Sequence, residues 1–217
     1  MQINSTNIVL FGIVLVSIAG VLAFKRDEPI TSILYTVSLA LLVSSIFFTV
    51  TVIAPEAKRR SRIRKGLRKQ YRSFKRRCID LFLISAKSQD YRNRDNLLDH
   101  QEFRRYFSIE VANGQSRWDL VATSIDNQDY IFQEIVRELE FLSREIEFVR
   151  SSVDIDDEEV EDFLINLSRL IHTIKAAEAN SDDYKHFCRT LWSIFTRWNV
   201  IDGQLEEDII ESMIERI

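Results

Sequence analysis

Cysteine, histidine and glycine are scarce in this sequence, which has 2 Cys, 3 His and 5 Gly among 217 residues. Two cysteines cannot form a disulfide framework, and because we place Cys78 and Cys188 in the cytoplasm, we expect free thiols. His186 and Cys188 are too close in sequence for a usual zinc pair, and no second pair lies nearby. The chain has no Walker loop, nucleophile elbow or His-Glu-x-x-His motif. We therefore expect no enzymatic activity, no metal and no cofactor.

Charged residues are missing from two long stretches near the N-terminus. Residues 1–24 and 30–54 contain no Asp, Glu, Lys or Arg. Apolar runs of about 17–25 residues are long enough to cross a hydrocarbon core of about 30 Å. Only a short polar segment separates the two runs. The pattern predicts a transmembrane helical hairpin over residues 1–55, with spans at about residues 8–24 and 30–54.

The distribution of basic residues predicts the orientation of this hairpin. Twelve Lys or Arg follow the second span within residues 58–77, whereas two lie between the spans. Because basic residues next to a span remain in the cytoplasm, we predict an inner-membrane protein with two spans and both termini in the cytoplasm. A cleaved signal peptide over residues 1–24 is the alternative, but residues 1–7 lack the positive charge that such peptides carry.

The basic segment itself is a candidate binding site. Its apolar residues recur at helical spacing, which predicts an amphipathic juxtamembrane helix over residues 56–90. We expect its cations to bind anionic lipid headgroups at the membrane surface. They are Lys58, Arg59, Arg60, Arg62, Arg64, Lys65, Arg68, Lys69, Arg72, Lys75, Arg76 and Arg77. Two other interpretations remain open, namely direct nucleic-acid binding and docking onto the acidic domain of the same chain.

The second apolar run carries small and hydroxyl side chains at helical spacing. One predicted stripe consists of Ser32, Thr36, Ala40 and Ser44, and a neighbouring face carries Ser38, Ser45 and Thr49. Small residues permit close approach of membrane helices, so these residues are candidates for helix packing or for lining a pore in a homo-oligomer. The alternative is that the hydroxyls bond backbone carbonyls or pack the hairpin against itself.

Residues 91–217 predict an acidic cytoplasmic helical domain, so the predicted fold class is all-α. Helix starts are expected at Asp95 or Asn96, near Ser116, near Asn127, within residues 154–162, near Asp182 and at Leu205. Pro55 predicts a kink or a restart of the helix at Ala54. The clearest seam alternates steps of three and four residues. It consists of Phe132, Ile135, Leu139, Leu142, Ile146 and Val149.

Charge is divided unevenly along the chain. Residues 58–77 carry twelve positive charges, whereas residues 78–217 contain 30 acids and 15 bases. Two arrangements of the basic segment follow from this division. In the first, residues 154–162 or 206–208 cover the cations, and in the second the cations lie on the bilayer. A partner could shift this balance only through a difference in its affinity for the two states.

The order of an apolar hairpin, a minimal external loop, a basic helix and a cytoplasmic helical domain resembles the two-transmembrane effectors of bacterial anti-phage systems. These include retron-associated and related abortive-infection effectors. The resemblance implies a membrane effector that permeabilises the inner membrane when its cytoplasmic domain or a protein or nucleoprotein partner is triggered. The alternative is a non-enzymatic membrane anchor or adaptor that recruits a cytoplasmic protein or nucleoprotein complex.

Overall fold

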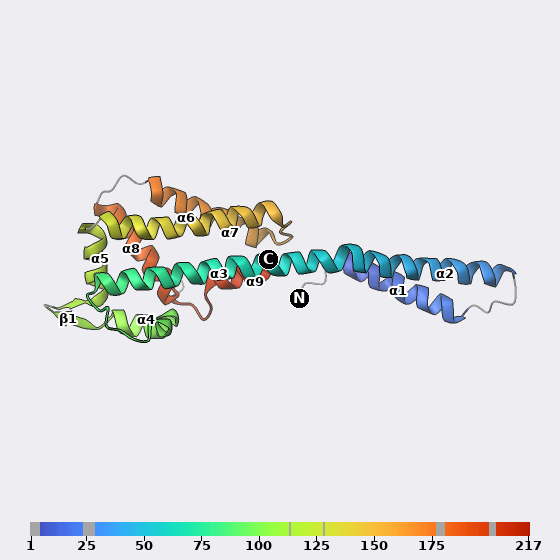
Figure 1. Cartoon of the computed structure of the whole chain (residues 1–217), viewed down its shortest axis with the longest axis horizontal. Coiled ribbons are helices and arrows are strands. Elements are labelled where there is room, and N and C mark those ends of the chain that lie inside the picture. Colours follow the sequence, from blue (N-terminus) through green and yellow to red (C-terminus); the bar gives the residue numbers. More distant parts are fainter. Residues whose placement is uncertain (1–4, 24–28, 113, 128, 177–180, 200–202) are drawn as a thin grey trace. The chain divides into compact units, whose positions relative to one another are not determined.

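The computed structural model describes residues 5–23, 29–112, 114–127, 129–176, 181–199 and 203–217, and these residues are mostly helical (Figure 1). The predicted helical fold class is therefore confirmed. The chain divides into two compact units, Met1–Ser61 and Arg62–Ile217. Most of the basic segment thus folds as part of the second unit, whereas the sequence suggested a separate juxtamembrane element.

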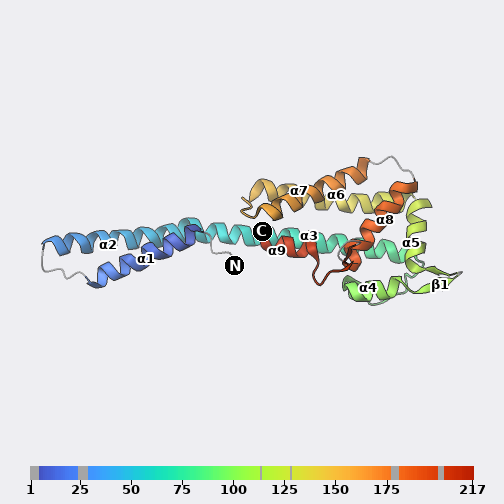
Figure 2. The ribbon, with the colours of Figure 1, turned by 180° about the vertical axis from the view of Figure 1, so that it is seen from behind.

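The first unit contains two apolar helices that pack side by side in antiparallel orientation (Figures 1 and 2). Helix α1 spans Ser5–Ala23 and α2 spans Pro29–Phe48. Pro29 occupies the first position of α2, where the N–H group that proline lacks would have no intrahelical partner. A π-helical segment, η1 (Thr49–Ile53), leads from α2 into α3 (Ala54–Ser85).

The prediction of a restart at Ala54 is confirmed, because α3 begins there after the π-helical segment, and Ala54 itself is helical although Pro55 follows it. A proline has no N–H to donate, and its ring clashes with the carbonyl four residues earlier in an α-helix. In this chain the preceding turn is π-helical, and the N–H of Ala54 bonds the carbonyl of Thr49 five residues back. The wider turn lets the helix continue past Pro55.

Within the described residues, one helix is long and apolar enough to cross a membrane, and it covers Thr31–Ser85. The apolar stretch Gly12–Ala23 in α1 falls below that length. Length and composition therefore support the second of the two predicted spans.

The second unit is built around the part of α3 that begins at Arg62. Its other elements are η2 (Arg94–Leu98, a 3-10 helix), α4 (His100–Phe107), β1 (Glu110–Ala112), β2 (Gln115–Ser116), α5 (Arg117–Asn127), α6 (Asp129–Ser152), α7 (Glu158–Ala176), α8 (Ser181–Thr196), β3 (Trp198–Asn199), β4 (Gly203–Gln204) and α9 (Ile209–Arg216). All six residues of the predicted α6 seam are buried. The inner face of α3 is also buried and joins the same core.

Aromatic rings form the centre of this core. The Phe82 ring of α3 lies 5.2 Å from that of Phe195 and 5.3 Å from that of Trp118, measured between centroids. Phe103 and Phe107 of α4 each lie 6.1 Å from Phe82. Because these rings come from α3, α4, α5 and α8, Phe82 joins four helices.

Three boundaries differ from the sequence predictions. Helix α4 begins after Asp99, whose carboxylate accepts hydrogen bonds from the backbone N–H groups of Gln101 and Glu102, and not at Asp95 or Asn96. Strand β1 pairs antiparallel with β2 where a short helix start was expected, and Gly114 before β2 has a φ of 74°, a left-handed conformation that glycine adopts without strain. A second antiparallel pair joins β3 with β4, and the last helix begins at Ile209 and not at Leu205.

Candidate functional site

Helix α3 forms ion pairs with the C-terminal helix α9 along its basic face. Arg68 lies 2.9 Å from Glu215, Arg72 lies 3.0 Å from Glu211, and Lys75 lies 3.1 Å from Asp208. The paired residues of α3 are four and then three positions apart toward its C-terminus, and their partners are four and then three positions apart toward the N-terminus of α9. The two helices therefore run antiparallel in a single register. We call this contact the α3–α9 junction.

The innermost pair of the junction is buried. Lys75 is 5% exposed, Asp208 is 6% exposed and Tyr71 is fully buried. The Tyr71 hydroxyl donates a hydrogen bond of 2.9 Å to the Asp208 carboxylate. The same carboxylate accepts hydrogen bonds from the backbone N–H groups of Ile210 and Glu211, so it also caps α9. A buried charge is tolerated only when it is paired and hydrogen-bonded, and the Asp208 carboxylate has four such donors.

Burial and electrostatics act together on Tyr71. Burial of the Tyr71 hydroxyl away from water holds its pKa well above the usual value, and the nearby Asp208 carboxylate raises this pKa further. Tyr71 is therefore a neutral hydrogen-bond donor over the physiological pH range. The Lys75 ammonium also lies 5.6 Å from the ring centroids of both Tyr71 and Phe195, which adds favourable cation–π contact.

The C-terminal helix is also held from its other side. Arg216 donates hydrogen bonds to Asp157 at 2.7 Å and to Glu159 at 2.6 Å, and the bond from Arg216 lowers the pKa of Asp157. These acids belong to the predicted acidic cluster, residues 154–162. Of the two acidic segments expected to cover the basic helix, residues 206–208 contribute Asp208 to it, whereas Asp157 and Glu159 bind α9.

The junction divides the predicted lipid-binding cations into groups. Lys75 is a correction to the predicted set, because it points into the core and not toward a membrane surface. Arg68 and Arg72 pair with α9, and Arg76 lies 3.1 Å from Asp95. Arg64 is half-buried, and its Nε atom has no hydrogen-bond partner.

The remaining predicted cations lie on the outside of α3. Arg59 and Arg60 lie 3.5 and 3.7 Å from Glu56. The others are exposed and form no ion pair within the part of the chain that the structure describes; they are Lys58, Arg62, Lys65, Lys69 and Arg77. These exposed cations are the ones available to an anionic surface.

The small and hydroxyl residues of α2 and of Thr49 in η1 separate into a covered face and an open face. Ser38 and Thr49 are half-buried and Ser45 is 6% exposed, which matches a side covered by α1. The hydroxyls of Thr36, Ser45 and Thr49 each donate to the carbonyl four residues earlier, at 2.8 Å. Thr36, Ala40 and Ser44 are exposed, and Ser32 is half-buried.

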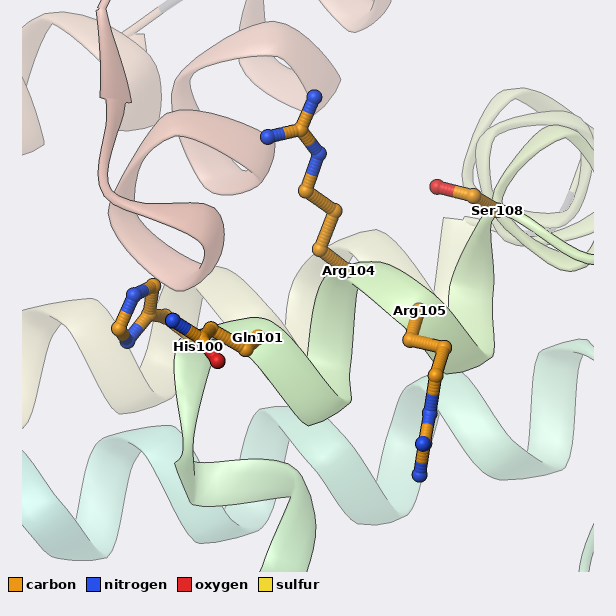
Figure 3. Close-up of a pocket in the computed structure, with 5 residues that line it drawn as sticks. All are labelled: His100, Gln101, Arg104, Arg105 and Ser108. Atoms are coloured by element: carbon orange, nitrogen blue, oxygen red, sulfur yellow. The ribbon is translucent and has the colours of Figure 1, made fainter. Parts of the chain in front are cut away.

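One cavity of the second unit, of about 490 Å³, lies against α4 and is lined by His100, Gln101, Arg104, Arg105 and Ser108. Figure 3 shows that the Arg104 and Arg105 side chains point in opposite directions, and Arg105 pairs with Glu102. No group of three or more His, Cys, Asp or Glu in the described residues is placed to hold a metal ion.

The basic helix predicted over residues 56–90 contains Tyr71 and Lys75, but the pairing of both with Asp208 was not predicted. A signal for the cap existed, because Asp208 is followed three residues later by Glu211 ahead of an apolar run, a pattern typical of helix starts. Nothing in the sequence indicated which cation Asp208 would meet. Comparisons with protein-family models, curated proteins and solved structures give no match.

Proposed function

We propose that this protein is a non-enzymatic membrane anchor that presents its second unit to a cytoplasmic protein or nucleoprotein partner. The observation that carries the proposal is the helix Thr31–Ser85, which is apolar in its first part and contributes to the domain core in its last part. A chain built in this way ties the helical domain covalently to a bilayer. The covered, internally bonded hydroxyls of α2 need no role beyond packing.

The proposed location is the inner membrane of a bacterium, with α1 and α2 as two spans and both termini in the cytoplasm. Lys58, Arg59 and Arg62 remain exposed within eight residues of Ala54. This is the region in which positive charge sets orientation and in which cations meet anionic headgroups.

A reporter fused to either terminus is expected to be active only as a cytoplasmic reporter, because two spans return the chain to its starting side. In a matched chain that begins at Pro29, a single span remains, and the C-terminal reporter should stay cytoplasmic because the basic segment is unchanged. The measurement is reporter activity in intact cells. Periplasmic activity at the N-terminus alone would show that α1 does not cross the membrane.

A membrane-permeabilising effector is the second candidate, and the open face of α2 favours it. Thr36, Ala40 and Ser44 are exposed small residues at a four-residue spacing, so another helix could approach closely along this face. In that case the second unit would hold the apolar helices inactive until a partner binds it.

Membrane potential distinguishes the two candidates. For an anchor, neither the full chain nor a chain ending at Ser61 should depolarise cells, because the apolar helices only hold the protein in place. A voltage-sensitive dye measures this in cells that express each chain at equal levels. Depolarisation by the shortened chain that Ala40→Leu and Ser44→Leu abolish would favour the effector, since the larger side chains block close helix approach.

A further inference from the structure

The outer face of α6 is the strongest unassigned surface of the second unit. Phe141 is 44% exposed and Phe148 is 54% exposed, although α6 also supplies the longest seam of the core. Arg137 and Arg144 are exposed on the same face. Aromatic residues and arginine are the side chains most enriched at protein interfaces. We call these four residues the α6 stripe.

The spacing of the α6 stripe is symmetric. From Arg137 to Phe141 is four residues, from Phe141 to Arg144 is three, and from Arg144 to Phe148 is four. Steps of four and three keep all four side chains on one side of a helix. The spacing is therefore the same in both directions along α6, whereas the order of residue types, Arg-Phe-Arg-Phe, becomes Phe-Arg-Phe-Arg when reversed.

An antiparallel copy of α6 is consequently complementary to α6 itself. In that register Arg137 of one copy faces Phe148 of the other, and Phe141 faces Arg144. Each guanidinium then lies on an aromatic ring, and the two-fold symmetry repeats every contact. Within one chain, the Arg144 guanidinium already lies 5.9 Å from the Phe141 ring centroid, so arginine and phenylalanine of this stripe already form a cation–π contact.

We propose that the α6 stripe is a homodimer contact in which two copies of the second unit pair through antiparallel α6 helices. The partner is a second copy of this chain, because the order of arginine and phenylalanine along the stripe places an arginine opposite a phenylalanine when the stripe meets its own reverse. The stripe extends for about 16 Å along α6, which is short for an independent interface. Tethering two copies to one membrane raises their effective concentration and favours such a contact. The geometry holds for an anchor and for an effector alike.

Co-purification of two differently tagged full-length chains from membranes tests the proposal. Phe141→Arg should abolish co-purification, because the introduced guanidinium would lie against that of Arg144 in the other copy. The double variant Phe141→Arg with Arg144→Phe should restore it, because a guanidinium again faces an aromatic ring at each position. Both positions are exposed, so circular dichroism should show unchanged folding in each variant.

Cysteine pairing gives an independent measure of the register. One tagged chain carries Phe141→Cys and the other Arg144→Cys, and oxidation should link them, whereas Ser151→Cys in place of Arg144→Cys should not link. The native Cys78 and Cys188 are buried and serve as background in all chains. Three results would each overturn the proposal. The unmodified chains fail to co-purify, the Phe141→Arg variant still co-purifies, or the double variant does not restore co-purification.

Discussion

Replacing Asp208 by alanine is expected to destabilise the second unit by about 3–5 kcal/mol, because it leaves the Lys75 ammonium buried without a partner. The same change removes the hydrogen bond from Tyr71 and the cap of α9. The three tryptophans, at positions 118, 192 and 198, all lie in the second unit. The midpoint of urea unfolding of the full chain in detergent, followed by tryptophan fluorescence, therefore reports on this unit.

Two matched variants identify the cause of that loss. Glu211→Ala removes an exposed ion pair at the same junction and should change stability by no more than about 1 kcal/mol. Lys75→Met combined with Asp208→Ser removes both buried charges and keeps a capping hydroxyl, so it should recover most of the stability. If Asp208→Ala were as mild as Glu211→Ala, the buried pair would not stabilise the junction.

Replacing Phe82 by alanine is expected to cost about 3–5 kcal/mol, since it leaves a cavity among the rings that join α3 to α4, α5 and α8. Ile84 lies two residues further along α3 and is 47% exposed, so Ile84→Ala should have an effect of about 0.5 kcal/mol or less. Tryptophan fluorescence during urea unfolding measures both variants. Equal, small effects would mean that α3 is not a core helix, as would hold for a helix lying on the bilayer.

The apolar pattern of α3 identifies which face of this helix is apolar but not what covers that face. The apolar stripe of this helix consists of Ile63, Leu67, Tyr71, Phe74, Cys78 and Leu81. Its four middle residues are buried, and Ile63 and Leu81 at its ends are half-buried. The same stripe would fit a helix that rests on lipid, because periodicity identifies an apolar face without identifying what covers it. Lys75 is one residue from Phe74, and only the position of Asp208, 133 residues away, makes its burial possible.

Local interactions explain which predictions were confirmed. The core seam of α6 and the helix near Ser116 depend on side chains within a few residues of one another. The π-helical turn before Pro55 and the two antiparallel strand pairs were missed. In each of these segments the backbone can adopt two local conformations of similar energy, and packing elsewhere in the fold decides which one forms.

The sequence by itself determined the long apolar segments, the basic run, the acidic remainder and the helical fold, because charge and hydrophobic periodicity are properties of neighbouring residues. Only the tertiary structure decided which cations remain free. The α3–α9 junction neutralises Arg68, Arg72 and Lys75 through acids more than 130 residues later in the chain. A contact at that separation depends on how the intervening helices pack, and this packing leaves Arg62 and Lys69 exposed.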